Sequence, residues 1–210
     1  MTGLAVTAAV LALGACESES DAPAKSKGTS TASVVAPGKP GEPARTISAE
    51  EAAKSVPDDT PNDADFGYAE MMIEHHKQAL TMAALSPDRA SSAKVKALSE
   101  RIAAAQKPEI TAMQGWLKNN SKDRPKGGGH HEHGSEPMPG MATEVQLKQL
   151  GASKGKAFDE LFLKLMIVHH QGAVTMATDA VSSGNNILIQ EMANDVIAQQ
   201  TSEIGRMQKL

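Results

Sequence analysis

The chain has 210 residues and a formal net charge of −4, and its 21 basic and 25 acidic side chains are interspersed. This charge balance argues against a nucleic-acid partner, which a basic patch would indicate. Aromatic residues make up only 2% of the chain, so Ala, Leu, Ile, Val and Met must supply the core. Strand-like alternation of apolar and polar residues does not occur, and we therefore predict an all-α fold.

An apolar stretch, Leu4–Leu13, opens the chain and leads to small residues before Cys16. The stretch is too short to span a bilayer as a stable anchor, and the pattern is typical of a signal peptide over residues 1–15. It also resembles the lipobox of bacterial lipoproteins, which implies cleavage before Cys16, lipidation of its thiol and a location on the cell membrane outside the cytoplasm. Because Cys16 is the only cysteine, disulfides and thiolate metal ligands are excluded. The alternative is an ordinary signal peptide in which Cys16 has no role.

Residues 16–47 are rich in Ser, Thr, Ala, Pro, Gly and Lys and contain almost nothing that could be buried. This composition predicts a disordered tether, with an end-to-end distance of about 30 Å. Residues 48–210 are expected to form a single domain of ordinary size. Ser48 and Glu51 have a capping-box pattern, which predicts a short helix at its start.

The domain contains an internal repeat with an offset of 94 residues. At about 100° per residue, apolar residues surround the first histidine of each repeated His-His pair. The first histidine is therefore predicted to face the interior of a helical bundle, and the second to lie at its edge. The residues shared by the two copies are Met72, His75, His76 and Met82 in the first and Met166, His169, His170 and Met176 in the second.

The repeat continues into a second helix in each half. Ser86 and Pro87 predict the start of the first of these helices, and Pro108 predicts a bend within it. We therefore predict two helical hairpins, residues 63–116 and 157–210, which form a pseudo-symmetric four-helix bundle. The matching positions are Val95, Leu98, Ile102, Gln106, Glu109 and Met113 in the first copy and Ile189, Met192, Val196, Gln200, Glu203 and Met207 in the second.

Residues 119–142 join the two repeats through a stretch rich in Gly, His and Met that is not expected to be helical. Ordering a flexible segment around an ion carries an entropic cost, so we expect this linker to bind metal weakly and to act as a capture arm. The alternative is a solvated loop. Thr143 and Gln146 then have a capping-box pattern and predict a short helix. The candidate ligands of the arm are His130, His131, His133, Met138 and Met141.

The histidines at the centre of the two apolar stripes need partners, because an unsatisfied buried polar group costs roughly 2–7 kcal/mol. Their occurrence in two copies, each surrounded by methionines, favours metal binding over packing alone. The rise per residue places Glu109 and Glu203 level with the first histidines, either as ligands or as residues that orient an imidazole. Thioether and imidazole ligands suit copper, especially Cu(I), better than zinc or iron. The candidate metal ligands are Met72, His75, His76, Met82, Glu109, Met113, Met166, His169, His170, Met176, Glu203 and Met207.

The segment from Phe158 to Ala177, together with the His-, Gly- and Met-rich linker before it, resembles the DUF305 family, a domain of unknown function. The resemblance covers about residues 63–210. It implies a secreted bacterial protein of ferritin-like helical fold, and some family members are regarded as copper-binding periplasmic proteins. The first copy departs from the pattern, with Lys77-Gln78 where the second copy has Gln171-Gly172.

We therefore expect a copper-binding lipoprotein that buffers or sequesters the metal outside the cytoplasmic membrane, without catalytic residues. One alternative is a ferritin-like, metal-dependent oxidoreductase with a dinuclear site, although the sequence offers no nucleophile constellation. A second alternative is a cell-surface interaction domain in which the histidine pairs are purely structural.

Overall fold

The computed structural model describes residues 33–125 and 138–210, which fall into two compact units divided between Val56 and Pro57. In the described part of the first unit, β1 (Ser33–Ala36) and β2 (Arg45–Ser48) form a two-stranded antiparallel sheet. α1 (Ala49–Ser55) follows directly and begins with the predicted capping box between Ser48 and Glu51.

The small sheet corrects the expectation of a tether without structure up to residue 47. The β-branched residues Val34, Val35 and Ile47 favour extended backbone, and Val34 is paired with Ile47. Gly41, with φ of 90°, lets the chain turn between the strands. The earlier part of the predicted tether, the predicted signal peptide and Cys16 lie outside the described residues.

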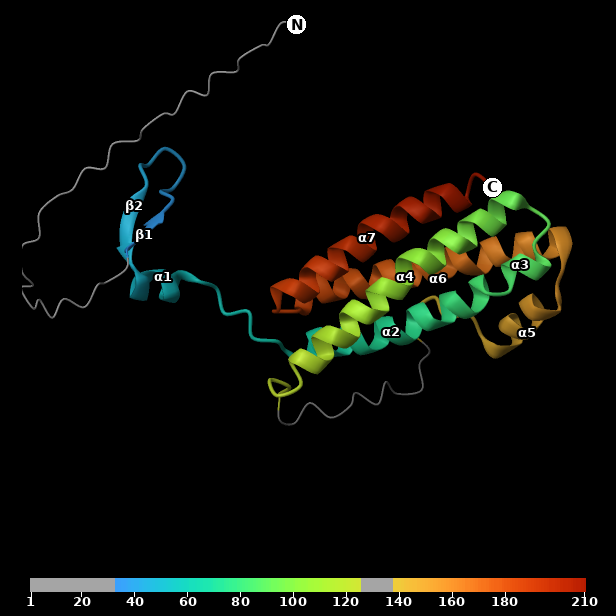
Figure 1. The fold of residues 1–210 in the computed structure, drawn as a ribbon, viewed down its shortest axis with the longest axis horizontal. Coiled ribbons are helices and arrows are strands. Elements are labelled where there is room, and N and C mark those ends of the chain that lie inside the picture. The colour runs from blue at the N-terminus through green and yellow to red at the C-terminus, as the bar shows by residue number, and fades with distance from the viewer. Residues whose placement is uncertain (1–32, 126–137) are drawn as a thin grey trace, which may run out of the picture. The chain divides into compact units, whose positions relative to one another are not determined.

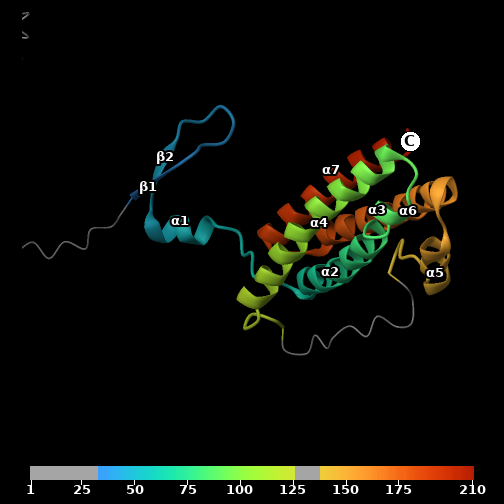
Figure 2. The same ribbon diagram turned by 45° about the vertical axis from the view of Figure 1, so that its right-hand side comes forward.

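The second unit contains, in its described residues, a bundle of four long helices arranged as two hairpins (Figure 1). The first hairpin consists of α2 (Asp63–Ala83) and α4 (Ala93–Asn119), and the second of α6 (Gly155–Ser183) and α7 (Ile187–Met207). α2 packs against α4 and α6, α6 packs against α7, and Figures 1 and 2 show α4 beside α7. None of the helices in the described ranges is both long and apolar enough to cross a bilayer. The predicted all-α bundle of two repeated hairpins is confirmed.

Short helices lie in two connections of the bundle. α3 (Ser86–Arg89) separates α2 from α4 and has Leu85 as its N-cap, so the predicted start of the long helix at Ser86 is wrong. Pro87 lacks a backbone N–H and restricts the residue before it, which separates this turn from α2. The equivalent residues of the second repeat have no proline, and α6 continues through them. α5 (Glu144–Ala152) begins with the predicted capping box.

The two hairpins hold each other through equivalent aspartates. α4 follows the N-cap Ser92 and α7 follows the N-cap Asn186, and these caps are 94 residues apart. The buried carboxylate of Asp65, on α2, accepts the backbone N–H of Asn186 and that of the preceding residue, both at 3.1 Å. Asp159, on α6, accepts the N–H of Ser92 at 2.9 Å and that of the preceding residue at 3.2 Å. Each hairpin therefore fixes the start of the last helix in the other.

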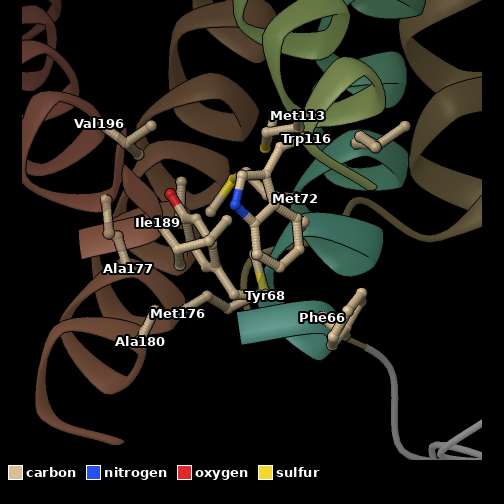
Figure 3. Packing of buried hydrophobic residues seen from close by; sticks show 14 residues of the cluster. Phe66, Tyr68, Met72, Met113, Trp116, Met176, Ala177, Ala180, Ile189 and Val196 are labelled. Atoms are coloured by element: carbon tan, nitrogen blue, oxygen red, sulfur yellow. The ribbon is translucent and has the colours of Figure 1, made fainter. Parts of the chain in front are cut away.

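The described residues of the bundle form two apolar clusters, one toward each end. All four long helices pass from one cluster to the other at buried His, Gln or Glu residues, so a polar layer separates the clusters. Figure 3 shows side chains of the first cluster converging from different helices. This cluster includes Phe66, Tyr68, Met72, Met113, Trp116 and Met176, and the second includes Met82, Leu98, Phe158, Phe162, Met166 and Met207.

Candidate metal centre

The four histidines of α2 and α6 lie in the polar layer between the two clusters. The rings of His75 and His169 lie against each other, with centroids 3.7 Å apart and 35° between the ring planes. His76 and His170 are as completely buried as their neighbours, and all four side chains are 0% exposed. The prediction that the second histidines lie at the edge is therefore wrong. α2 contacts α4 and α6, and α6 contacts α2 and α7. The buried part of each helix surface is therefore wide enough to include both histidines of a pair.

The second histidine of each pair is held by a glutamate of the same hairpin. His76 Nε2 lies 2.7 Å from Glu109 Oε2, and His170 Nε2 lies 2.8 Å from Glu203 Oε2. The predicted level along the hairpin is correct, but the glutamate contacts the second histidine rather than the first. The side chain of Glu109 is 23% exposed and that of Glu203 only 4%. The first His-Glu pair therefore reaches the surface, and the second is enclosed.

The end of the linker is docked over the first histidine, and we call residues 138–142 the docked segment. His75 Nε2–H donates a hydrogen bond of 3.0 Å to Pro139 O, which leaves Nδ1 as the nitrogen with a free lone pair. Gln78 makes two hydrogen bonds with the backbone of Ala142, at 2.7 and 3.0 Å. On α6, Gly172 allows the segment to approach so closely that a Cβ there would lie 2.0 Å from Pro139 O. The segment is thus fixed to α2 and α6, the first helix of each hairpin.

The docked segment carries two of the predicted arm ligands. Met138 packs against the first apolar cluster, and Met141 is half-buried. The expectation that these methionines lie on a flexible arm is wrong, because the hydrogen bonds at His75 and Gln78 hold the segment on the bundle. The other arm ligands, His130, His131 and His133, lie outside the described residues.

Several buried polar atoms of the layer have no hydrogen-bond partner within the described ranges. Burial, together with the smaller effect of the neighbouring histidines, lowers the pKa of His169 to about 2. Burial also lowers the pKa of His75 to about 4, against the opposing effect of the Pro139 carbonyl. Both rings are therefore neutral at neutral pH, the state in which imidazole binds a metal. The unpaired atoms are both ring nitrogens of His169, Nδ1 of His75, His76 and His170, and the side-chain amides of Gln106 and Gln200.

The buried methionines form two equivalent sets, one in each apolar cluster. Met72, Met113 and Met176 belong to the first cluster, and Met166, Met207 and Met82 to the second. In the part of the chain that the structure describes, no three His, Cys, Asp or Glu side chains are gathered so that they could hold an ion. Neutral imidazoles flanked by thioethers fit a soft ion such as Cu(I).

Three contributors to this site were not predicted: Pro139, Gln78 and Gly172. The signal that could have identified two of them is the departure from the repeat at equivalent positions 78 and 172. Both residues contact the docked segment, one through its amide and the other through its missing side chain. A difference between two copies of a motif thus marks the place where a segment outside the repeat is bound.

Comparisons with known proteins find relatives of the same architecture. The chain is similar to a DUF305 protein from Streptomyces coelicolor, assigned as secreted, with 35% identity over 69% of this chain and 88% of that one and a TM-score of 0.61. A DUF305 fragment from Deinococcus radiodurans has 27% identity over 70% of this chain and 93% of that one, with a TM-score of 0.59.

The chain is also similar to CopM, which has been solved with bound Cu(I), Cu(II) and silver. The Cu(I) form has 28% identity over 69% of this chain and 93% of that one, with a TM-score of 0.55. None of the curated proteins compared with the chain matches it. The family model described as domain of unknown function DUF305 matches residues 65–210, which is well over half of the chain. The protein therefore belongs to the DUF305 family.

Proposed function

We propose that this protein binds Cu(I) in the histidine layer of its bundle and buffers or sequesters copper outside the cytoplasmic membrane. The observation that carries the proposal is the buried pair His75 and His169, whose neutral rings have nitrogens without a partner in the described residues. Two sets of thioethers flank these rings, as a soft ion requires. The similarity to CopM, solved with Cu(I), Cu(II) and silver, supports the same class of metal.

In this proposal, the ligands come from the two helices that form the centre of the bundle. Met72 and His75 on α2 and Met166 and His169 on α6 bind the ion. His75 ligates through Nδ1, because its Nε2–H is bonded to Pro139 O. The adjacent histidines, each oriented by a glutamate, bring further imidazoles to the layer. The remaining thioethers are those of Met82, Met113, Met176 and Met207.

We also propose that the protein is secreted and lipid-anchored. The signal-peptide pattern over residues 1–15 and the lipobox-like cysteine, Cys16, support this location, as does the similarity to a relative assigned as secreted. We propose the linker histidines, with Met138 and Met141, as a weaker metal site.

Replacing His75 and His169 together with leucine tests the copper site. We expect the Cu(I) affinity to fall at least 100-fold, measured by competition with a chromogenic Cu(I) chelator under reducing conditions. The apo-protein should stay folded with a stability close to that of the wild type, because three ring nitrogens without partners are removed while one hydrogen bond, from His75 to Pro139 O, is lost. The double variant Ile73→Leu and Ile167→Leu, at equivalent positions of the same helices, is the matched control and should retain wild-type affinity.

The same experiment distinguishes a structural role of the histidines. If the rings serve only to stabilise the bundle, the double leucine variant should lose on the order of 1–3 kcal/mol of unfolding free energy per site. A variant that is destabilised but still binds Cu(I) with full affinity would overturn the proposed function.

A further inference from the structure

The seam between α4 and α7 contains a groove of about 500 Å³ over the first His-Glu pair. Its polar and thioether lining comes from Glu109, Met113, Met192, Asp195 and Gln199. The Nε2 atom of Gln199 is buried and has no hydrogen-bond partner among the described residues. The groove therefore combines soft and anionic groups with an amide nitrogen that has no partner among the described residues.

The opposite end of the same seam has the reverse chemistry. Under the 94-residue offset, Leu98 and Arg101 are the equivalents of Met192 and Asp195. Arg206 likewise stands where the groove has an alanine. A thioether and a carboxylate at one end are thus replaced by an alkyl group and guanidinium groups at the other. Since like charges repel and opposite charges attract, a cation is drawn to the groove and repelled from its counterpart.

The groove is connected to the histidine layer through two of its lining residues. Glu109 lines the groove and also bonds His76 Nε2, at 2.7 Å. Met113 lines the groove, is only 2% exposed, and packs in the same cluster as Met72 (Figure 3). Met192 packs against that cluster from a half-buried position. The thioethers of Met192, Met113 and Met72 therefore form a series from the surface to the layer.

We infer that this groove is the route by which a soft monovalent cation, Cu(I) or Ag(I), reaches and leaves the buried histidine layer. Asp195 attracts the ion, Met192 is the first thioether to bind it, and Glu109 and Met113 lead it inward. The opposite end is closed, because Glu203 is 4% exposed where Glu109 is 23% exposed. This inference rests on the proposed copper binding and adds the end of the bundle at which the ion enters and leaves.

The inference is tested by the rate of metal binding rather than by affinity. Ag(I) serves as a redox-inert probe and is mixed rapidly with the full chain, while the fluorescence of Trp116 is recorded. Trp116 is the only tryptophan and packs in the cluster of Met72 and Met113. Equilibrium affinity is measured separately by chelator competition.

Two variants copy the opposite end of the seam into the groove, Met192→Leu and Asp195→Arg. We expect Asp195→Arg to slow association about tenfold or more at low salt, and less at high salt because the charge is screened. Met192→Leu should slow association by a similar factor at any salt concentration. Affinity should stay within about twofold of wild type, because a residue on the route changes association and dissociation together.

Two matched controls separate a local effect from a general one. Glu100→Arg, on the exposed surface of α4, makes the same change in net charge, and Leu98→Met makes the reverse thioether change at the other end. Both should bind Ag(I) at the wild-type rate. Wild-type rates in both groove variants, or equal slowing by Glu100→Arg and Asp195→Arg, would overturn the route alone. A wild-type protein that binds neither Ag(I) nor Cu(I) would overturn the proposed function and the route with it.

Discussion

The two repeats of the bundle share their framework but differ in how they are covered. Both use an aspartate to hold the opposite hairpin, a glutamate to hold the second histidine, and a set of three methionines. In the first repeat, however, His75 is bonded to the docked segment, whereas neither ring nitrogen of His169 has a partner in the described residues. A repeated sequence thus builds a symmetric scaffold, and a single linker breaks the symmetry because it can dock in only one place.

This difference assigns unequal roles to the two central imidazoles. His75 has one nitrogen committed to a backbone carbonyl, so its orientation is fixed before any ion arrives. His169 has both nitrogens free of such bonds, so its ring is the less constrained of the two. The pKa values reflect the same asymmetry, since the carbonyl of Pro139 is the main effect that opposes burial at His75, whereas the backbone of residue 75 has the smallest effect on the pKa of His169.

Acid should produce the largest effect on the apo-protein, and it should separate the two histidines. Both pKa values are lowered from 6.5, to about 4 for His75 and about 2 for His169. Below pH 6.5 the unfolded chain therefore binds more protons than the folded one. The free energy of unfolding then decreases as the pH is lowered, by up to about 1.4 kcal/mol per pH unit for each ring. This loss ends near pH 4 for His75 and continues toward pH 2 for His169.

The single variants His75→Leu and His169→Leu should each remove one part of this pH dependence, measured by urea unfolding of the apo-protein between pH 7.5 and pH 3. Above pH 4 the two variants should gain the same resistance to acid, and below pH 4 the His169→Leu variant should be the more resistant. A pH dependence identical to that of the wild type in both variants would show that the rings bind protons as readily in the folded state as in the unfolded state, so that burial does not lower their pKa values.

The paired aspartates should be the next most important residues, and the symmetry predicts similar effects for both. Asp65→Ala and Asp159→Ala each leave two backbone N–H groups at the start of a helix in the other hairpin without their acceptor. Each also loses one further hydrogen bond, from the Asn62 N–H to Asp65 and from the Ser91 hydroxyl to Asp159. We expect each variant to lose about 2–4 kcal/mol of unfolding free energy. Asp179→Ala, at an exposed position of α6, should change stability by less than about 0.5 kcal/mol. A large loss in only one of the two variants would mean that the hairpins do not depend on each other equally.

The docked segment is tested by adding a methyl group where it approaches α6. In Gly172→Ala the new Cβ would lie 2.0 Å from Pro139 O and 2.8 Å from the Cα of Gly140, so the segment must move. We expect a loss of about 1–3 kcal/mol, and faster hydrogen exchange of the Ala142 N–H, which Gln78 binds in the wild type. Gly205→Ala is the matched control, because its Cβ meets no atom within 4 Å and should stabilise α7 by about 0.5–1 kcal/mol. Unchanged protection of Ala142 in Gly172→Ala would contradict the proposed docking.

Periodicity and the 94-residue offset were sufficient to predict the hairpins and the histidine layer. Helical arithmetic gives the height and the angle of a residue, but not the width of the arc that its neighbours bury. The arithmetic therefore predicts an edge position for His76, which is fully buried, and it predicts the correct level for Glu109, which contacts His76 rather than His75. Contacts of the docked segment could not be derived from its composition, because the Gly and Pro residues that indicate flexibility also permit close approach. Composition likewise does not predict the sheet between residues 33 and 48, because the pairing of its two strands outweighs the weak local preference for disorder.

The smallest expected difference is between the losses of unfolding free energy when either glutamate is removed. It reports how far water reaches toward the second histidine in each repeat. Glu109→Ala and Glu203→Ala both remove the acceptor of a buried histidine N–H. In the enclosed pair the N–H of His170 is left without an acceptor, and we expect a loss of about 2–3 kcal/mol. In the exposed pair, water can enter from the groove and replace the carboxylate, so the loss should be about 1 kcal/mol smaller. Urea unfolding of the apo-proteins at pH 7.5 measures both, and a larger loss in Glu109→Ala would show that the groove does not admit water to the layer.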